Sequence, residues 1–412
     1  MLAGCRDTRR PPAPNKKKPQ PDVVVQLVQQ MESGAGPKAI WGSFHKLQAM
    51  GQRALPSLIR LATSKEPPLR RGAARGFAAV GAPANRVMPQ VLALLGDPDA
   101  QVRFTTVQAL PRLQGSTKPA LKRLRSLLHD PDHKVREAAV DVLVKLAPDQ
   151  TLPWLKQDLA HEQSGVRATA IQGLGLLGKP ALPVLDRIIA ATVDSDKNVR
   201  YEAFATLVRL GPSASSAIGA LEKQVGDARV TVRLGAVRAL GSVATTEPAA
   251  ALALGRALGD RDDRVRNAAA AALAGMGAAA APATESLIQS LADPSHHTRT
   301  SAAQALGAVA NGASVAIPAL RQRLGDSRFD VVLAAGEALG RIARSRPAAA
   351  AALRKALGHK RPQTREAAVA GVGTMGPRGA WARPALRKMS KSDDNVAVRQ
   401  RAVRVLQALG NR

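Results

Sequence analysis

The sequence predicts an all-α fold, an α-solenoid in which about eleven antiparallel helix pairs of roughly 33 residues each stack into a superhelix. Three observations lead to this prediction. One dipeptide recurs at a nearly constant interval through most of the 412 residues. Hydrophobic residues make up 45% of the chain and aromatic residues only 2%, which favours closely packed helices rich in Ala, Leu and Val. No stretch has the alternating β-branched and aromatic pattern of strands, so we expect essentially no sheet.

The recurring dipeptide is Val-Arg, with Leu or Thr replacing the Val in some copies and Val332 replacing the Arg in one. Its second residue advances by 33 positions in all but two steps, which are 31 and 34 residues long. Chance does not produce such a period, which matches a repeat made of two helices. The copies are Leu69-Arg70, Val102-Arg103, Val135-Arg136, Val166-Arg167, Val199-Arg200, Val232-Arg233, Val265-Arg266, Thr298-Arg299, Val331-Val332, Thr364-Arg365 and Val398-Arg399.

Each copy is expected to open the second helix of a pair. In eight of the eleven copies an aspartate stands six residues before the Arg position, where its side chain suits a helix N-cap. The seventh position after the Val is always small or β-branched, which lets neighbouring helices approach closely. Glycines such as Gly178 and Gly277 close the helix, and a proline-containing segment starts its companion. In the other three copies the capping position is Ser64, His161 or His359.

This pattern resembles the HEAT repeat family, particularly its short form named for phycobilisome lyases, over roughly residues 50 to 412. In that family the aspartate and the arginine pair along the solenoid, so the resemblance implies a structural ladder rather than a binding surface. Val332 departs from the pattern, and we expect an interrupted ladder near it. The ladder residues are Asp97, Arg103, Asp130, Arg136, Arg167, Asp194, Arg200, Asp227, Arg233, Asp260, Arg266, Asp293, Arg299, Arg365, Asp393 and Arg399.

The N-terminal segments differ from the repeats. Residues 22–50 are predicted to form two capping helices, and the repeats follow over residues 51–412. Residues 1–21 are basic and rich in proline, so we expect a disordered tether. Within the tether, Leu2-Ala3-Gly4-Cys5 resembles the lipobox of bacterial lipoproteins, which implies lipidation of Cys5, the only cysteine.

No apolar segment precedes this lipobox, so an ordinary cytosolic N-terminus is the open alternative. The protein is then cytoplasmic as written, or lipid-anchored in the cell envelope if its true start lies upstream of Met1. At the other end, the third position after the Val is mostly small but is Arg401 in the last copy. We expect this position to face the next repeat, which makes Arg401 part of the solvated outer wall of a C-terminal cap.

The formal net charge of +29 is spread unevenly. Residues 293–412 contain 21 basic and 7 acidic residues, whereas residues 194–292 contain 11 and 10. The sixth position after the Val, which we expect on the concave face, includes Arg75, Gln108 and Asp141 and forms no basic stripe. The candidate surface for an anionic partner therefore lies in the C-terminal third: Arg321, Arg323, Arg341, Arg344, Arg346, Arg354, Lys355, Lys360, Arg361, Arg383, Arg387, Lys388 and Lys391.

Candidate catalytic and metal-binding residues are few. His129 and His133 have i, i+4 spacing, but Asp130-Pro131 lies between them, so we expect turn histidines rather than metal ligands. HEAT-type deoxyhypusine hydroxylases hold two irons through several His-Glu pairs, whereas this chain has one, His161-Glu162. There is no nucleophile–base pair, phosphate-cradling glycine loop or paired carboxylate motif. We therefore expect neither catalysis, nor a cofactor, nor a small-molecule substrate.

The leading hypothesis is a monomeric, non-catalytic scaffold that holds a protein partner along the concave face of the solenoid. The alternative is electrostatic binding of nucleic acid, another anionic polymer or a membrane surface through the basic C-terminal third. A bilin lyase-like enzyme, a third hypothesis, follows only from the family resemblance.

Overall fold

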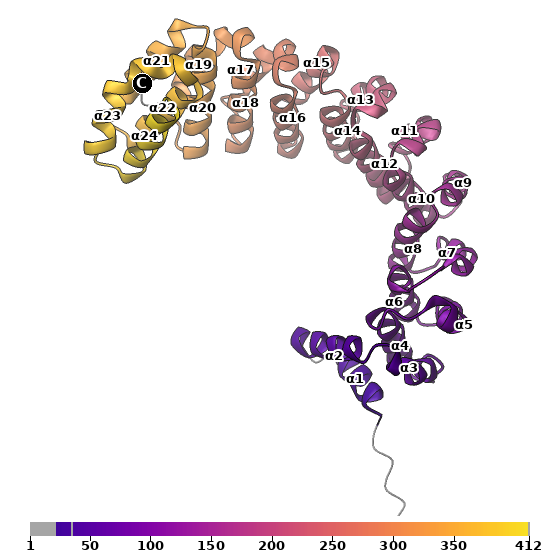
Figure 1. Ribbon diagram of the computed structural model, residues 1–412. Coiled ribbons are helices and arrows are strands. Elements are labelled where there is room, and N and C mark those ends of the chain that lie inside the picture. The colour runs from indigo at the N-terminus through magenta and orange to yellow at the C-terminus, as the bar shows by residue number, and fades with distance from the viewer. Residues whose placement is uncertain (1–21, 34–35, 411–412) are drawn as a thin grey trace, which may run out of the picture. The chain divides into compact units, whose positions relative to one another are not determined.

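The computed structural model describes residues 22–33 and 36–410, and within these the predicted all-α fold is confirmed (Figure 1). The described residues contain no strand, only one isolated bridge between Pro83 and Gln114. The predicted tether and Cys5 lie outside the described residues. The chain divides into two compact units, residues 1–151 and 152–412, with the boundary inside helix α9 (Pro148–Asp158).

The N-terminal unit starts with two helices, α1 (Val23–Glu32) and α2 (Pro37–Met50), in the region where the sequence predicts capping helices. Val24, Leu27, Val28 and Met31 bury the inner side of α1. The helices that follow are α3 (Leu55–Leu61), α4 (Pro67–Ala79), α5 (Ala84–Leu94), α6 (Ala100–Ala109), α7 (Leu121–Leu127) and α8 (His133–Leu146).

The C-terminal unit continues the same alternation of short and long helices. Its helices are α10 (Ser164–Leu177), α11 (Leu185–Ala191), α12 (Lys197–Leu210), α13 (Ile218–Gln224), α14 (Val230–Val243), α15 (Pro248–Ala257), α16 (Asp263–Met276), α17 (Thr284–Ser290), α18 (His296–Val309), α19 (Ile317–Arg323), α20 (Phe329–Ala343), α21 (Pro347–Leu357), α22 (Pro362–Thr374), α23 (Arg383–Ser392) and α24 (Val396–Ala408).

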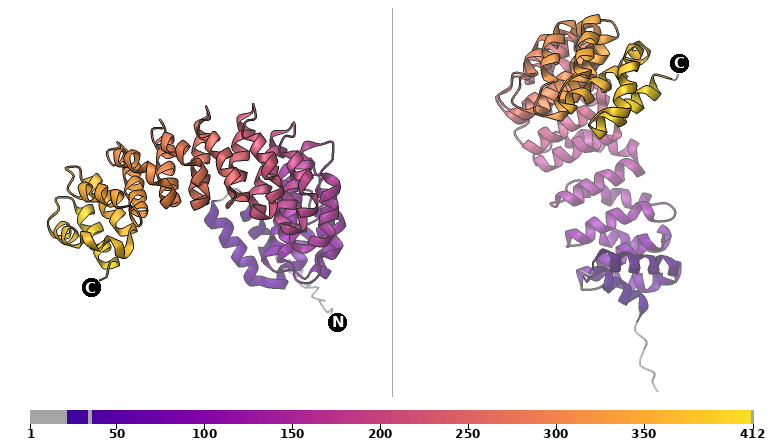
Figure 2. Two further views of the ribbon diagram at one scale, coloured as in Figure 1. Left: turned by 90° about the horizontal axis from the view of Figure 1, so that it is seen from above. Right: turned by 90° about the vertical axis from the view of Figure 1, so that its left-hand side faces the viewer.

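The eleven copies of the dipeptide lie on the eleven even-numbered helices from α4 to α24, which we call the second helices. Within each unit every second helix packs on the next one, as α4 does on α6 and α20 on α22. The odd-numbered first helices form a second layer, and most of them pack mainly on the second helix that follows (Figure 1). Two further views show the helices of each unit stacked in chain order (Figure 2). This is the nearest-neighbour packing of a solenoid.

The second helices begin two residues later than the aspartate position predicts. Asp99, not Asp97, is the N-cap of α6, and its carboxylate accepts a hydrogen bond from the Val102 amide. Asp97 instead accepts a bond of 2.9 Å from the Asp99 amide, which closes the turn before the helix. The predicted capping role of this aspartate row is therefore wrong, because its members hold the preceding turn. His161 and His359 also hold this turn, because Nδ1 of each accepts a hydrogen bond from the backbone amide two residues later in the chain.

The predicted glycine ends are confirmed, because Gly178, Gly211, Gly277 and Gly376 all have positive φ after a second helix. Ala310 occupies the corresponding place after α18 with φ 52° and ψ −100°. It is the only described residue other than glycine with a positive φ. A side chain at such a φ is strained by about 1–3 kcal/mol.

Small residues let the second helices touch, most closely between α20 and α22. A Cβ added to Gly340 would lie 2.0 Å from the Gly371 carbonyl oxygen and 2.1 Å from Thr374 Oγ1. A Cβ on Gly371 would lie 2.3 Å from the Gly336 carbonyl oxygen. Since backbone atoms block both positions, only glycine fits them.

We predict that Gly340→Ala destabilises the protein by about 2–3 kcal/mol, because α20 and α22 must separate to admit the methyl group. Urea denaturation followed by circular dichroism measures this loss. Gly275→Ala on α16 is the matched control, since a Cβ there meets nothing within 4 Å. That change is expected to stabilise its helix by up to about 1 kcal/mol. Equal stability of the two variants would contradict the close approach.

Candidate functional site: an arginine ladder and a groove in the N-terminal unit

The arginine of most of the dipeptides joins two turns. Arg103 Nη1 donates to the carbonyl oxygens of Asp97 and Pro98, at 2.8 and 3.1 Å, in the turn before its own helix. Its Nε and Nη2 donate to the two carboxylate oxygens of Asp130 in the next repeat, both at 2.7 Å. The Asp130 carboxylate also accepts a bond from the Asp132 amide. One guanidinium therefore fixes its own turn and the next turn together.

The same ion pair recurs between most neighbouring repeats, with both side chains largely buried. Two ladder arginines differ: Arg136 and Arg200 bond their own turns, but Nε of each is buried without a hydrogen-bond partner. Asp227, which the pattern assigns to Arg200, instead pairs with Arg229. The pairs that form are Arg70–Asp97, Arg103–Asp130, Arg167–Asp194, Arg233–Asp260, Arg266–Asp293, Arg299–Asp326 and Arg365–Asp393.

At Val332 the ladder is interrupted, and a different arginine occupies the gap. Arg361, in the turn before α22, donates from Nη1 to the Gly325 carbonyl at 2.7 Å and from Nη2 to the Asp326 carbonyl at 3.0 Å. The turn before α20 is therefore bound from the following repeat instead of by its own helix. Arg361, predicted as part of an anionic-partner surface, is thus engaged in holding two repeats together. The last ladder arginine, Arg399, bonds the Asp393 carbonyl of its own turn.

The ladder lowers the pKa of Asp326 and of Asp260. Burial raises the pKa of Asp326, but hydrogen bonds from the Arg299 guanidinium and the Arg328 amide lower it more, so the net pKa lies below the ordinary value. The pKa of Asp260 is lowered against burial in the same way, by Arg233 and the Asp262 amide. A carboxyl group whose pKa is depressed by folding stabilises the protein above its unfolded pKa of about 3.9. That stabilisation is lost as the pH falls through the folded pKa.

We predict that Asp326→Asn lowers the free energy of unfolding at pH 7 by about 3 kcal/mol, because it leaves the charge of Arg299 without its buried partner. The difference from the wild type should shrink as the pH falls through the depressed pKa of folded Asp326, since Asp326 itself then becomes protonated. Urea denaturation at pH 7, 5, 4 and 2 measures both effects. Asp263→Asn, an exposed carboxylate outside the ladder, is the control and is expected to change stability by less than about 0.5 kcal/mol. A pH-independent difference would contradict the ion-pair explanation.

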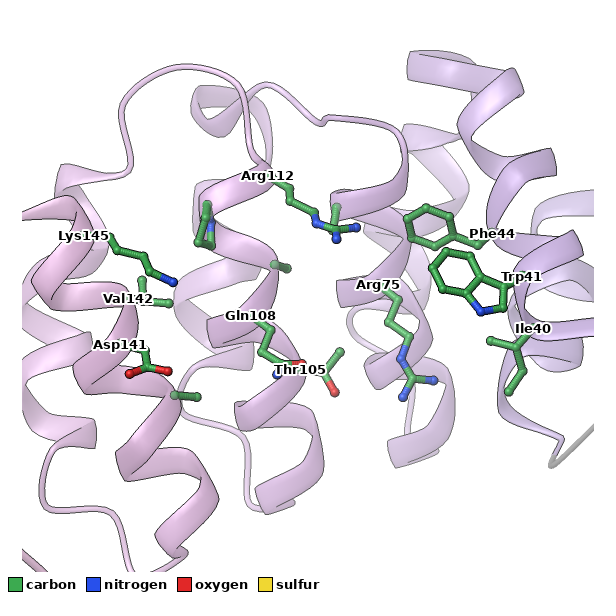
Figure 3. A pocket seen from close by; sticks show the side chains of 14 residues that line it. Ile40, Trp41, Phe44, Arg75, Thr105, Gln108, Arg112, Asp141, Val142 and Lys145 are labelled. Atoms are coloured by element: carbon green, nitrogen blue, oxygen red, sulfur yellow. The ribbon is translucent and has the colours of Figure 1, made fainter. Parts of the chain in front are cut away.

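The N-terminal unit contains a groove of about 620 Å³ between α2 and the second helices α4, α6 and α8. Ile40, Trp41 and Phe44 of α2 form one wall (Figure 3). The opposite wall is made by Asp141, Val142 and Lys145 of α8, and Thr105 and Gln108 lie between them. The sixth-position residues Arg75, Gln108 and Asp141, expected to face solvent, all line this groove.

Aromatic side chains give the α2 wall its character. Trp41 is 60% exposed, although Trp is among the rarest residues of this chain. Its ring stacks on His45 at 5.9 Å and meets Phe44 edge-on at 6.0 Å. The Arg112 guanidinium lies over the Phe44 ring at 5.9 Å. The exposed face of Trp41 is therefore held in place by its neighbours rather than free to turn.

Charges of both signs surround these rings. Arg75 is held by Glu32 of α1, which also pairs with Arg71, so its charge is compensated. Lys145 and Arg112 are exposed, and Asp141 is half-buried on the same face. The groove can accommodate an apolar or aromatic side chain flanked by polar groups. Sequence reasoning identified the row of Arg75, Gln108 and Asp141 but did not place α2 beside it.

Among residues 22–33 and 36–410, no group of three or more His, Cys, Asp or Glu side chains is placed to hold a metal ion. His296 and His297 are the first two residues of α18. His296 is half-buried, and its Nδ1 lies 2.7 Å from Asp330 Oδ2 on α20. In the same part of the chain, no helix combines the length and apolar character needed to cross a bilayer.

The predicted anionic-partner residues of the C-terminal third are not all available to a partner. Arg323 pairs with Asp326, Arg354 lies 4.6 Å above the Trp381 ring, and Arg383 donates to the Leu409 carbonyl. Arg344 donates to the Thr374 carbonyl. The remaining members are exposed and make no ion pair within the described residues: Arg321, Arg341, Arg346, Lys355, Lys360, Arg387, Lys388 and Lys391.

Arg401 does not form an outer wall, and that prediction is wrong. Its Nε lies 2.9 Å from Glu366 Oε1 on α22, and the Arg401 side chain is only 24% exposed. The third position faces the preceding repeat, not the next one, as Gly235 also shows by its contact with the Phe204 ring. The residue at this position therefore contacts the second helix of the preceding repeat.

Comparison with known proteins identifies the repeat. A sequence profile of HEAT repeats matches residues 55–143, 121–195, 185–274, 253–340 and 284–372. No curated protein sequence matches the chain significantly. Among solved structures, it is similar to Kap95p in complex with RanGDP, with a TM-score of 0.66, 14% identity, and coverage of 94% of this chain and 60% of Kap95p.

A second similar structure is the karyopherin Kap121p bound to the extreme C-terminus of the protein phosphatase Cdc14p, with a TM-score of 0.60 and 15% identity. A third is Kap121p bound to Pho4p, with a TM-score of 0.61 and 16% identity. Each match covers 94% of this chain but only about half of Kap121p. At this level of identity the likeness establishes a shared fold alone.

Proposed function

The chain belongs to the HEAT repeat family, and from this premise we propose that it is a non-catalytic scaffold that binds a protein partner on its second-helix face. The observation that carries the proposal is the groove beside α2, where Trp41 is 60% exposed above a floor of polar and small side chains. The narrower likeness to the repeats of phycobilisome lyases stays a prediction.

The composition of the groove favours a protein ligand. An exposed Trp next to Phe44 offers a large apolar surface that gains free energy when a partner covers it. Trp, Tyr and Arg are the residues that most often dominate binding energy at protein interfaces, and this groove has Trp41 and Arg112 side by side with Phe44. The groove has a volume of about 620 Å³ and runs along the second helices α4, α6 and α8. This size and length suit several side chains of one extended or helical segment.

The solved neighbours support the same class of function by analogy. The two complexes of Kap121p contain the extreme C-terminus of the phosphatase Cdc14p and the protein Pho4p, respectively. A solenoid offers such a segment a row of equivalent helices, so that contacts accumulate along the array. For the present chain we infer a protein partner whose bound segment carries apolar or aromatic residues.

We predict that Trp41→Ala weakens binding of this partner by about 30-fold or more without changing stability, since Trp41 is a surface residue at the centre of the contact. A photo-crosslinking amino acid at Gln108 captures the partner in cells, and calorimetry with the purified partner measures the dissociation constants. Tyr201→Ala on α12 is the control, because Tyr201 is 67% exposed outside the groove. A partner that binds the Trp41 and Tyr201 variants equally would contradict the proposed site.

A second candidate function has its own observation. The first helices α19, α21 and α23 contain eight basic residues and no acidic one, whereas α13 and α17 each contain an acidic residue. Five of the eight make no ion pair or hydrogen bond through the side chain within the described residues: Arg321, Lys355, Arg387, Lys388 and Lys391. Uncompensated charge on successive helices favours electrostatic attachment to an anionic polymer.

If that attachment occurs, replacing Arg387, Lys388 and Lys391 together with Gln is expected to lower the salt concentration at which the protein elutes from heparin. The control replaces Lys197, Lys223 and Arg256, three exposed cations elsewhere in the same unit, and changes the net charge equally. If the two triple variants elute at the same salt concentration, retention depends only on net charge, and a localised binding surface is contradicted.

A further inference from the structure

A second hollow lies in the C-terminal unit where α18, α20 and α22 end. Its volume is about 400 Å³. Gly307 and Ala308 of α18 and Ala310 line one side, and Arg341, Arg344 and Ser345 at the end of α20 line another, with Arg378 following α22. The lining contains three arginines and no acidic residue.

The three guanidinium groups differ from those of the ladder. Every paired ladder arginine has a carboxylate, whereas Arg341 and Arg378 have no ion-pair or hydrogen-bond partner within the described residues, and both are exposed. Glu337, one turn before Arg341, does not line the hollow and makes no ion pair in the described chain. Like charges collected without a counter-ion repel one another, so an anion bound among them would be stabilising.

Arg344 prepares the hollow for an anion. Helix C-termini present free carbonyl groups that repel negative charge. Arg344 Nε donates to the Thr374 carbonyl at 2.8 Å, which neutralises the end of α22 and fixes the guanidinium at the hollow. The end of α22 at the hollow is thus already occupied by a cation.

The opposite side is kept open by small residues. Gly307 lies against the α20 backbone, since a Cβ there would be 2.8 Å from the Cα of Ala338. Ala308 and Ala310 add only methyl groups, and Ala310 holds φ 52° where six other repeats have a glycine with positive φ. Strained backbone of this kind is concentrated at ligand sites. The hollow is larger than a single oxyanion needs and falls within the size range of small-ligand pockets.

We propose that this hollow binds a phosphate group, either as inorganic phosphate or as a phosphate monoester. Arginine is suited to this ligand because its planar fork donates two parallel hydrogen bonds to phosphate oxygens. Arg341 and Arg378 make the principal contacts, the Ser345 end of α20 borders the ester side, and Arg344 supplies fixed positive potential.

The test is isothermal titration of the full chain with inorganic phosphate and, separately, with N-acetyl-O-phosphoserine amide, at constant ionic strength. Saturable binding is expected, and Arg341→Gln combined with Arg378→Gln should weaken it at least about tenfold. The control combines Lys197→Gln with Lys223→Gln, which removes the same charge from exposed positions of α12 and α13 and should leave binding unchanged. Thermal melts of all variants establish that they are folded.

Ala308→Glu gives an independent reading, because it keeps every arginine but places a carboxylate in the hollow. It is expected to abolish phosphate binding and to raise the melting temperature. Tighter binding of the phosphoserine compound identifies the ligand as a monoester, and equal binding identifies free phosphate; both results support the site. Absence of saturable binding, or equal binding by the control, the double variant and Ala308→Glu, would overturn it.

Discussion

The guanidinium at the start of each second helix is the interaction on which the repeat array depends. Arg103 satisfies two carbonyl groups of its own turn and both oxygens of Asp130, and that carboxylate in turn accepts an amide of the next turn. Turn geometry and repeat stacking are thereby set by the same side chain. In a solenoid no distant contact can replace this link, since each repeat touches only its neighbours.

The repeat at Val332 shows that the link can be made in other ways. Arg361 binds the turn from the following repeat, and α20 and α22 approach until backbone meets backbone at Gly340 and Gly371. Close packing of helices without side chains between them gains dispersion energy over a large area. Between α20 and α22, close glycine contacts therefore take the place of one buried ion pair, and the two-layer arrangement is kept.

The sequence was sufficient for the repeat length, the position of all eleven second helices and the glycine ends, because these follow from local periodicity. It misplaced the N-caps by two residues, since Asp97 and Asp99 are both suitable and only the ladder decides between them. The sequence pattern predicted that Arg401 faces away from the array, whereas Arg401 faces the preceding repeat. This direction depends on how the helices pack. The groove was not predictable because Trp41 comes to line it together with Arg75 and Gln108 only through tertiary packing of α2.

Charge and structure are also coupled through the ladder. Seven aspartates are committed to buried pairs, which leaves few acidic side chains to balance the cations of α19, α21 and α23. One interface in the C-terminal unit, between α12 and α14, lacks this ion pair. Arg200 Nε has no hydrogen-bond partner there, because Asp227 pairs with Arg229 instead. In a linear array of repeats, local unfolding can start or stop at the interface with the weakest contacts. The helices before and after the interface of α12 with α14 are therefore expected to exchange their amide protons as two separate cooperative blocks.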